Sequence, residues 1–285
     1  MRLFLKGLLL VGVLIASTCA QVKNDTKPPP ANSPAPLQAK GLLVRYIANM
    51  GVLLSSGDRH VLIDAIHRKY KPAYVFPSPE LLSDIEQARP PYDSIELVLV
   101  THMHLDHFHP ESVGLHLKND PKSILVSSAQ VVGEIGKGFA DHDKLRAQVK
   151  EVTPEWGKRI DLEVNGIKLA LLGFRHVNAQ HRSIQNLGYL IEIGGKKVLH
   201  VGDAELTMEN FAAFQLEKEN IDVAILPQWF LEESGGCEMV NKLINAKNVI
   251  ATHISAGYTD EVADKVKKSC AGADAFTTML EERTY

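Results

Sequence analysis

Cysteine is scarce in this chain of 285 residues, which contains three. Cys237 and Cys270 lie 33 positions apart and do not show the C-x-x-C spacing that is typical of a structural zinc site. The two can pair in an oxidising compartment, but spacing does not decide this, because reach and side-chain direction control disulfide formation. The third, Cys19, lies in the N-terminal segment described below.

The chain also lacks a strong charge of either sign. Its net charge is −3, its pI is about 6.5, and like charges occur in short pairs such as Lys267-Lys268. No global field therefore favours nucleic acid or an anionic membrane, and we expect a small-molecule substrate. The N-terminal apolar run, residues 7–16, is about half as long as the roughly 20 residues that a bilayer needs, so we expect no stable membrane span.

The first 40 residues have the layout of an exported protein. Arg2 and Lys6 precede the apolar run, and Thr18 and Ala20 stand at the −3 and −1 positions of a cut before Gln21. Residues 1–20 are therefore interpreted as a signal peptide, and a periplasmic or extracellular location is expected. Cys19 leaves lipoprotein anchoring as an alternative. Residues 21–40, with five prolines, are interpreted as a linker.

Residues 41–285 alternate between strand-like and helix-like stretches. Apolar runs or turn residues mark strands at 42–47, 51–56, 60–66, 95–100, 123–128, 159–174, 187–203, 221–227 and 248–255. Helical patterns cover 78–88, 128–139, 143–149, 208–220, 237–246 and 260–271. Hairpins mixed with strands that helices separate predict two mixed sheets packed face to face, with helices outside.

Metal-type ligands gather behind one of these strands. The stretch "ELVLVTHMHLDHFHP", residues 96–110, contains His102, His104, Asp106, His107 and His109. His102 and His104 are two positions apart, so extended backbone points both side chains the same way and they can share one cation. Asp106 and His107 follow a turn and suit a second cation. Imidazoles with a few carboxylates are a typical zinc set, although iron and manganese also fit.

Four more polar residues stand where apolar strands end. Asp64, His176, Asp203 and His253 follow strand-like runs, and strand ends at one edge of a sandwich can converge. A carboxylate such as Asp203 can bridge two cations and offset their repulsion. We favour His176 over His181 as a ligand, because His176 directly follows an apolar strand.

These motifs carry a resemblance. "THMHLDH" matches the H-x-H-x-D-H pattern of the metallo-β-lactamase-fold hydrolase superfamily, and "VLIDA", "LLGFRH", "HVGDAEL" and "IATHIS" resemble its other motifs in the right order. The chain resembles in particular the broad group that includes lactone and N-acyl phospholipid hydrolases. The resemblance covers nearly all of 41–285 and implies a four-layer αββα sandwich with two metal ions at one edge of the sheets.

The resemblance also implies a role for each ligand-type residue. The side chains implied for the first ion are His102, His104 and His176. Those implied for the second are Asp106, His107 and His253. Asp203 would bridge the two ions, and Asp64 resembles the carboxylate that orients the site.

The remaining histidines have ordinary interpretations. We expect His109 and His116 on a loop or helix surface, His60 in a turn, and His200 packed inside a strand.

Four residues are candidates for the wall of a substrate pocket. His67, Tyr70 and Tyr74 lie in the loop that follows Asp64, and Trp229 follows the strand at 221–227.

The pattern predicts a hydrolase with two divalent ions, zinc above all, that cleaves an ester, lactone or phosphodiester bond of a small molecule. The attacking group would be a hydroxide between the ions, and Asp106 would act as a catalytic residue that steers it. An iron-dependent oxidoreductase resembling persulfide dioxygenases is the alternative. A β-lactamase is a further alternative, although true metallo-β-lactamases generally lack the aspartate that stands here at 203.

Overall fold

Two seven-stranded mixed sheets form the framework of residues 41–285, which are the residues that the computed structural model describes. The predicted signal peptide 1–20 and linker 21–40 lie outside the described residues. Among the residues described, no helix has the length and apolar character needed to cross a bilayer.

The first sheet has the strand order β14-β1-β2-β3-β4-β5-β6. Its strands are β1 (Leu43–Ala48), β2 (Gly51–Ser56), β3 (Arg59–Ile63), β4 (Leu97–Val100), β5 (Ile124–Ser127), β6 (Val149–Glu151) and β14 (Glu282–Thr284). The meander β1-β2-β3 is antiparallel, as the short turns in the sequence predict, and β3 to β6 are parallel because helices or loops connect them.

The second sheet has the order β13-β12-β11-β10-β9-β8-β7. Its strands are β7 (Arg159–Val164), β8 (Ile167–Phe174), β9 (Asn186–Ile193), β10 (Lys196–His200), β11 (Val223–Pro227), β12 (Asn248–Thr252) and β13 (Asp274–Ala275). Two tight hairpins start it, turned at Asn165-Gly166 and Gly194-Gly195, and both central residues of each turn have positive φ. That backbone matches the twist of the flanking strands.

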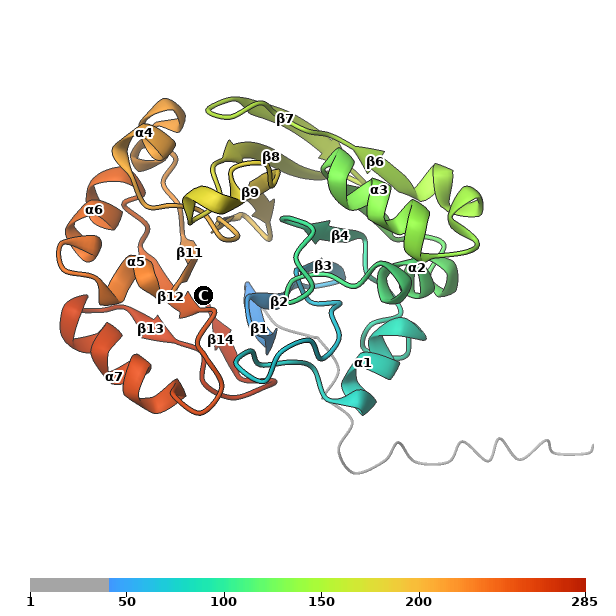
Figure 1. Cartoon of the computed structure of the whole chain (residues 1–285), viewed down its shortest axis with the longest axis horizontal. Helices are drawn as coiled ribbons and strands as arrows, with labels where there is room; N and C mark the ends of the chain where they lie inside the picture. Colours follow the sequence, from blue (N-terminus) through green and yellow to red (C-terminus); the bar gives the residue numbers. More distant parts are fainter. Residues whose placement is uncertain (1–40) are drawn as a thin grey trace, which may run out of the picture. The chain divides into compact units, whose positions relative to one another are not determined.

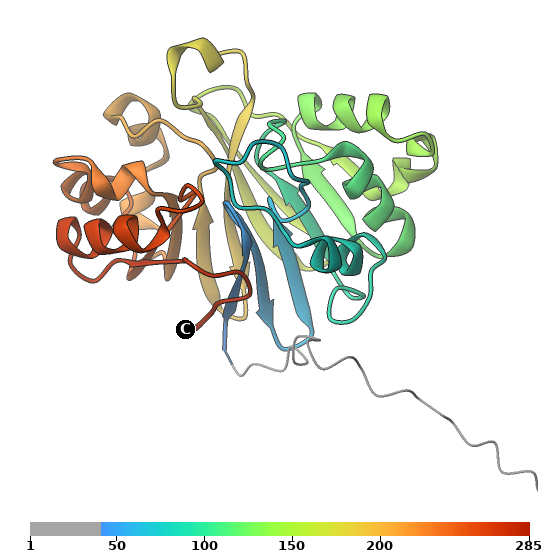
Figure 2. The ribbon, with the colours of Figure 1, turned by 60° about the horizontal axis from the view of Figure 1, so that its bottom comes forward.

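The sheets pack face to face, and helices cover both outer faces (Figures 1 and 2). The inner layer is apolar, with Leu54 and Leu99 of the first sheet in one buried cluster with Leu171 and Ile225 of the second. The helices over the first sheet are α1 (Pro79–Glu86), α2 (Pro110–Asn119) and α3 (Ala129–Gly138). Those over the second are α4 (Met208–Phe211), α5 (Trp229–Glu232), α6 (Gly236–Leu243) and α7 (Thr259–Ser269). The predicted αββα sandwich is confirmed.

Several local expectations were wrong. Helix α2 was not predicted; it starts at Pro110, and the His109 ring caps it by accepting from the backbone N–H of Ser112 at 3.4 Å. The expected helix at 208–220 is instead α4 followed by two short 3-10 turns, because Gln215 adopts a left-handed conformation with φ of 51°. The stretch 143–149 is mostly 3-10 helix, His142–Gln148.

Two histidines expected at the surface or in a turn are buried. His116 lies inside α2, where its Nδ1 is 2.7 Å from the Ile85 carbonyl oxygen. His60 is part of β3 and its Nδ1 is 3.0 Å from the Ser55 hydroxyl. Burial of both rings is tolerated because a polar partner from a neighbouring element lies beside each Nδ1.

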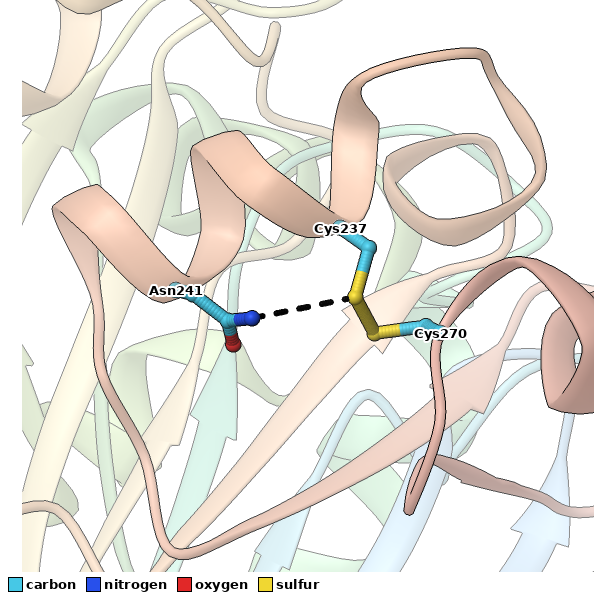
Figure 3. Close-up of a disulfide and its surroundings, with 3 residues drawn as sticks. All are labelled: Cys237, Asn241 and Cys270. Atoms are coloured by element: carbon cyan, nitrogen blue, oxygen red, sulfur yellow. Dashed lines mark hydrogen bonds between the residues drawn. A yellow bond between two sulfur atoms is a disulfide. The ribbon is translucent and has the colours of Figure 1, made fainter.

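A disulfide joins Cys237 and Cys270, which the sequence left open. Figure 3 shows the bond between α6 and the residue that caps the end of α7. The two Cα atoms are 5.3 Å apart, within the normal range for a disulfide. The bond ties together two of the helices over the second sheet.

Candidate metal centre

Ligand-type side chains from both sheets meet at one edge of the sandwich. His102 follows β4, His176 follows β8, Asp203 follows β10, and His253 follows β12. The strands are rigid and fully hydrogen-bonded, so the residues just beyond their ends are held in place by the framework. All seven residues that the sequence singles out as ligands lie within this edge.

The first group consists of His102, His104, His176 and Asp203, whose ligand atoms all lie within 4.8 Å of one another. His104 Nδ1 is 3.0 Å from His102 Nε2 and 3.2 Å from His176 Nε2. Asp203 Oδ2 lies 3.6 Å from His176 Nε2 and 3.9 Å from His102 Nε2.

The second group consists of Asp106, His107 and His253, and it adjoins the first. Asp106 Oδ2 lies 3.2 Å from His253 Nε2 and 3.6 Å from His107 Nε2. The other oxygen of Asp203, Oδ1, is 3.2 Å from His107 Nε2 and 3.5 Å from His253 Nε2. Asp203 therefore presents one oxygen to each group, as a carboxylate that bridges two cations must.

Three buried polar atoms without hydrogen-bond partners in the described part of the chain also indicate that these residues fit a metal ion. His107 Nε2, His253 Nε2 and Asp203 Oδ1 are buried and have no hydrogen-bond partner within residues 41–285. Buried polar atoms are rarely left unpaired, since each costs about 1–3 kcal/mol. Three such atoms that converge on one point are accounted for by a cation that they would bind together.

The electrostatics of the centre also suit cation binding. Burial lowers the pKa of His102 well below 6.5, and burial with the neighbouring His176 lowers the pKa of His104 to about 4. These imidazoles are therefore neutral at pH 7, as metal ligands must be. Burial alone would raise the pKa values of Asp106 and Asp203, but the nearby histidines outweigh it and hold both carboxyls below their usual range.

His107 responds in the opposite direction. Burial alone would lower its pKa, but Asp203 and Asp106 outweigh this effect and raise the pKa well above 6.5. A bound cation would take over the role of this proton, so metal binding should release it.

Asp64 is fully enclosed behind the centre. Its carboxylate accepts hydrogen bonds from the Thr101 backbone N–H at 2.8 Å and the Thr101 hydroxyl at 2.6 Å, and it lies 2.8 Å from His107 Nδ1. This contact fixes the His107 ring so that Nε2 faces the other ligands. The orienting role that the resemblance implies for Asp64 stays a prediction, and this contact is the one that would carry it.

Asn49 contributes to the centre, and sequence reasoning missed it. Its side-chain amide donates to the Asp106 backbone oxygen at 3.0 Å and to Asp106 Oδ2 at 3.2 Å, and its own backbone oxygen accepts from the His253 N–H at 2.9 Å. Asn49 lies in the turn between β1 and β2 with φ of 52°, which Asn tolerates. In sequence it is an ordinary turn residue, and no local signal marks its contact with Asp106.

A cavity of about 520 Å³ opens beside the ligands, with Tyr70, Tyr74 and Trp229 in its wall. His67 does not line it, contrary to expectation: the ring is completely buried, with Nε2 3.4 Å from the Ala48 carbonyl oxygen. The loop turns His67 inward and its tyrosines outward. His181 is on the cavity wall but belongs to neither ligand group.

His200 lies inside strand β10 and is fully buried, away from both ligand groups. Its Nε2 is 3.0 Å from the Met50 carbonyl oxygen, and its Nδ1 accepts from the Gly202 N–H at 3.2 Å. The packed role expected from the sequence agrees with this position.

Comparison with known proteins gives the same fold. A family model described as "Beta-lactamase superfamily domain" matches residues 59–271. A relative from Natranaerobius thermophilus named "UPF0173 metal-dependent hydrolase" is 28% identical over 190 residues, covering 65% of this chain and 69% of its own length. Its counterpart TTHA1283 from Thermus thermophilus is 27% identical over 193 residues, with shares of 65% and 70%.

Solved structures of distant sequence share the architecture. Igni18, a metallo hydrolase from Ignicoccus hospitalis, has a TM-score of 0.56 at 20% identity and covers 86% of this chain and 98% of its own. YhfI from Bacillus subtilis, a metallo-beta-lactamase fold protein, has a TM-score of 0.57 at 15% identity, with shares of 85% and 99%.

Proposed function

The chain belongs to the beta-lactamase superfamily domain family, and on that premise we propose that it is an exported enzyme that uses two divalent ions to hydrolyse an ester, lactone or phosphodiester bond of a small molecule. It is a metal-dependent hydrolase: relatives that match 65% of the chain carry that name, and the described residues hold two adjoining His/Asp groups. The single observation that carries the two-ion proposal is the position of Asp203, with one carboxylate oxygen facing each group.

The chemistry follows from what the side chains can hold. Two ions bound here would polarise a substrate oxygen and make a water acidic enough to attack at neutral pH. The neutral imidazoles of His102, His104 and His176 would hold the first ion, and Asp203 would keep the second close to it. A ligand set of imidazoles and carboxylates favours zinc, while iron and manganese accept the same donors.

Asp106 is proposed to act in the reaction as well as in binding. Its carboxyl has a pKa held low by His107 and His253 against the effect of burial, so it stays ionised and accepts hydrogen bonds. It also lines the substrate cavity. An ionised carboxylate in this position can orient the attacking water by accepting one of its protons.

Export is supported by the disulfide together with the N-terminal sequence. Disulfides persist in oxidising compartments and are rare where thiols are kept reduced. Cys237 and Cys270 form one in the described part of the chain. Residues 1–20 have the composition of a cleaved signal peptide.

Metal content is the first test. Protein purified without added metal is analysed by mass spectrometry of its metals, and we expect close to two zinc ions per chain. Iron as the bound metal, together with oxygen uptake on addition of a persulfide, would favour the oxidoreductase alternative. Absence of any bound transition metal would overturn the two-ion site.

Substrate class is the second test. The metal-loaded protein is screened against lactone, phosphodiester, thioester, carboxylic ester and β-lactam substrates. We expect turnover in the ester, lactone or phosphodiester class, and loss of that turnover in Asp203→Asn. His142→Ala is the matched control, because His142 lies in the 3-10 helix that precedes β6 and belongs to neither ligand group. Turnover of β-lactams alone would refute the proposed substrate class.

A further inference from the structure

The cavity beside the metal ligands has an aromatic wall. The rings of Tyr70 and Tyr74 are nearly parallel, with centroids 6.5 Å apart, and Tyr74 meets the His253 ring edge-on at 5.6 Å. Trp229 approaches the same histidine from α5, with centroids 5.1 Å apart. Its indole N–H donates to the Ala204 carbonyl at 3.2 Å, which fixes the ring against the cavity. The wall therefore offers apolar ring faces that extend to the metal ligands.

Most of the charged side chains in the cavity wall already have a partner or belong to a ligand group. The charged residues that line the cavity are Lys71, Asp106, Glu134 and Asp203. Asp106 and Asp203 belong to the ligand groups. Glu134 is paired with Lys137, with Oε1 2.8 Å from Nζ.

Lys71 differs from these three, because no carboxylate in the described part of the chain pairs with it. Its ammonium lies 4.9 Å from the centre of the Tyr70 ring, and among residues 41–285 it has no carboxylate in ion-pair contact. The cavity therefore presents, beside the aromatic wall, a cation that belongs to neither ligand group. An anion with an apolar body matches both features.

We propose that the substrates of this enzyme are organic anions with an apolar or aromatic body, in which the anionic group is separate from the bond that is cleaved and is bound by Lys71. The inference rests on the proposed hydrolase function and names its substrate class. The cavity of about 520 Å³ is of the size that encloses small molecules. One end of such a substrate lies at the metal ligands, its body lies on the aromatic wall, and its charge lies near Lys71.

A binding measurement tests this inference without turnover. The chain has two tryptophans, and Trp156 lies outside this cavity, so a Trp156→Phe background leaves Trp229 as the reporter. Metal-loaded protein is titrated with butyrate and, separately, with glutarate, while the fluorescence of Trp229 is recorded. Glutarate differs from butyrate by a second carboxylate. Exposed ion pairs contribute up to about 1 kcal/mol, so we expect glutarate to bind up to about fivefold more tightly.

Two variants locate the source of the preference. Lys71→Met should abolish the advantage of glutarate over butyrate, and Lys69→Met should retain it, because Lys69 is an exposed neighbour that does not line the cavity. Equal binding of the two acids by the Trp156→Phe protein, or an unchanged preference in Lys71→Met, would overturn the role of Lys71. 3-Phenylglutarate should bind more tightly than glutarate, and equal binding would overturn the role of the aromatic wall.

Turnover separates failure of this inference from failure of the proposed function. Mono-4-nitrophenyl glutarate is compared with its neutral methyl ester in metal-loaded protein. We expect Lys71→Met to raise KM for the anionic ester about fivefold with little change in kcat, and to leave the neutral ester unaffected. Hydrolysis of both esters at equal KM would leave the hydrolase function standing and refute the anion preference. A protein that holds two metal ions but hydrolyses no ester, lactone or phosphodiester would refute the function, and the acid titration would still decide on Lys71.

Discussion

Replacing Asp64 with asparagine removes one charge behind the metal centre and little else. The side chains have the same shape, and asparagine tolerates the positive φ of 48° at this position as well as aspartate does. The Asp64 carboxylate receives both hydrogen bonds from Thr101 and the contact from His107 Nδ1. An amide has one acceptor oxygen where the carboxylate has two. Its NH2 group must therefore face either the Thr101 backbone N–H, at the position of Oδ1, or both the Thr101 hydroxyl and the His107 ring, at the position of Oδ2.

The expected losses follow from these contacts. A hydrogen bond to a charged group contributes about 1.5–3 kcal/mol, so loss of one should lower the free energy of unfolding by about 2 kcal/mol. Partners that orient a metal ligand change metal affinity about 10- to 100-fold. That range corresponds to a loss of about 1.4–2.7 kcal/mol in metal-binding free energy. We expect the loss at the ligand group that contains His107. Metal affinity is measured by competition with a chromophoric chelator, and stability by urea unfolding of the metal-free protein.

Asp120→Asn is the matched control for Asp64→Asn. Asp120 is also buried, and it accepts from the Ile95 backbone N–H at 3.2 Å and the Ser123 hydroxyl at 3.1 Å. Ile95 precedes β4 and Ser123 precedes β5, whereas Asp64 bonds to Thr101, the residue after the end of β4. The control should lose comparable stability and keep its metal affinity. Equal metal affinity in the two variants would refute the orienting role of Asp64.

Three further predictions concern other parts of the molecule. His104→Ala should release metal and abolish hydrolysis, whereas His200→Ala should leave metal content intact and lower stability by about 1–3 kcal/mol, as metal analysis and urea unfolding would show. Replacing both Cys237 and Cys270 with serine should cost up to about 3.7 kcal/mol by urea unfolding, given the sequence separation of 33; a loss below about 0.5 kcal/mol would contradict this. Burial lowers the pKa of His67 from 6.5 to about 4. As pH falls, the His67 imidazole is therefore protonated in the unfolded chain before it is protonated in the folded protein. Stability should therefore fall by up to about 3 kcal/mol as pH decreases from 6.5 to 4, and His67→Gln should flatten that decline.

The α/β architecture and the position of the ligands could be predicted from local patterns. Strand-forming runs and turn pairs such as Asn165-Gly166 are properties of neighbouring residues, and they predict strands and hairpins without knowledge of the partner. His102 and His104 are two positions apart on extended backbone, and that spacing alone brings their side chains together. His176 and His253 were proposed as ligands because each follows an apolar run, and the structure brings both to the same edge as His102 and His104.

Contacts between segments far apart in the chain could not be predicted in this way. Asn49 bonds to Asp106 across 57 positions, and His200 bonds to Met50 across 150. The first pair depends on the order of β1, β2 and β4 within the first sheet, and the second pair depends on how the two sheets pack, and no local pattern specifies either. The inward turn of His67 and the burial of His116 depend in the same way on what packs against them.

The sequence by itself determined most of the strands and helices and which side chains follow the strand ends, because both depend on the periodicity of a few adjacent residues. Only the tertiary structure decided that the two oxygens of Asp203 face different ligand groups, that Lys71 shares a cavity with Trp229, and that Cys237 reaches Cys270. Each of these depends on distances between segments far apart in the chain. Those distances are set when the two sheets bury their apolar faces against each other.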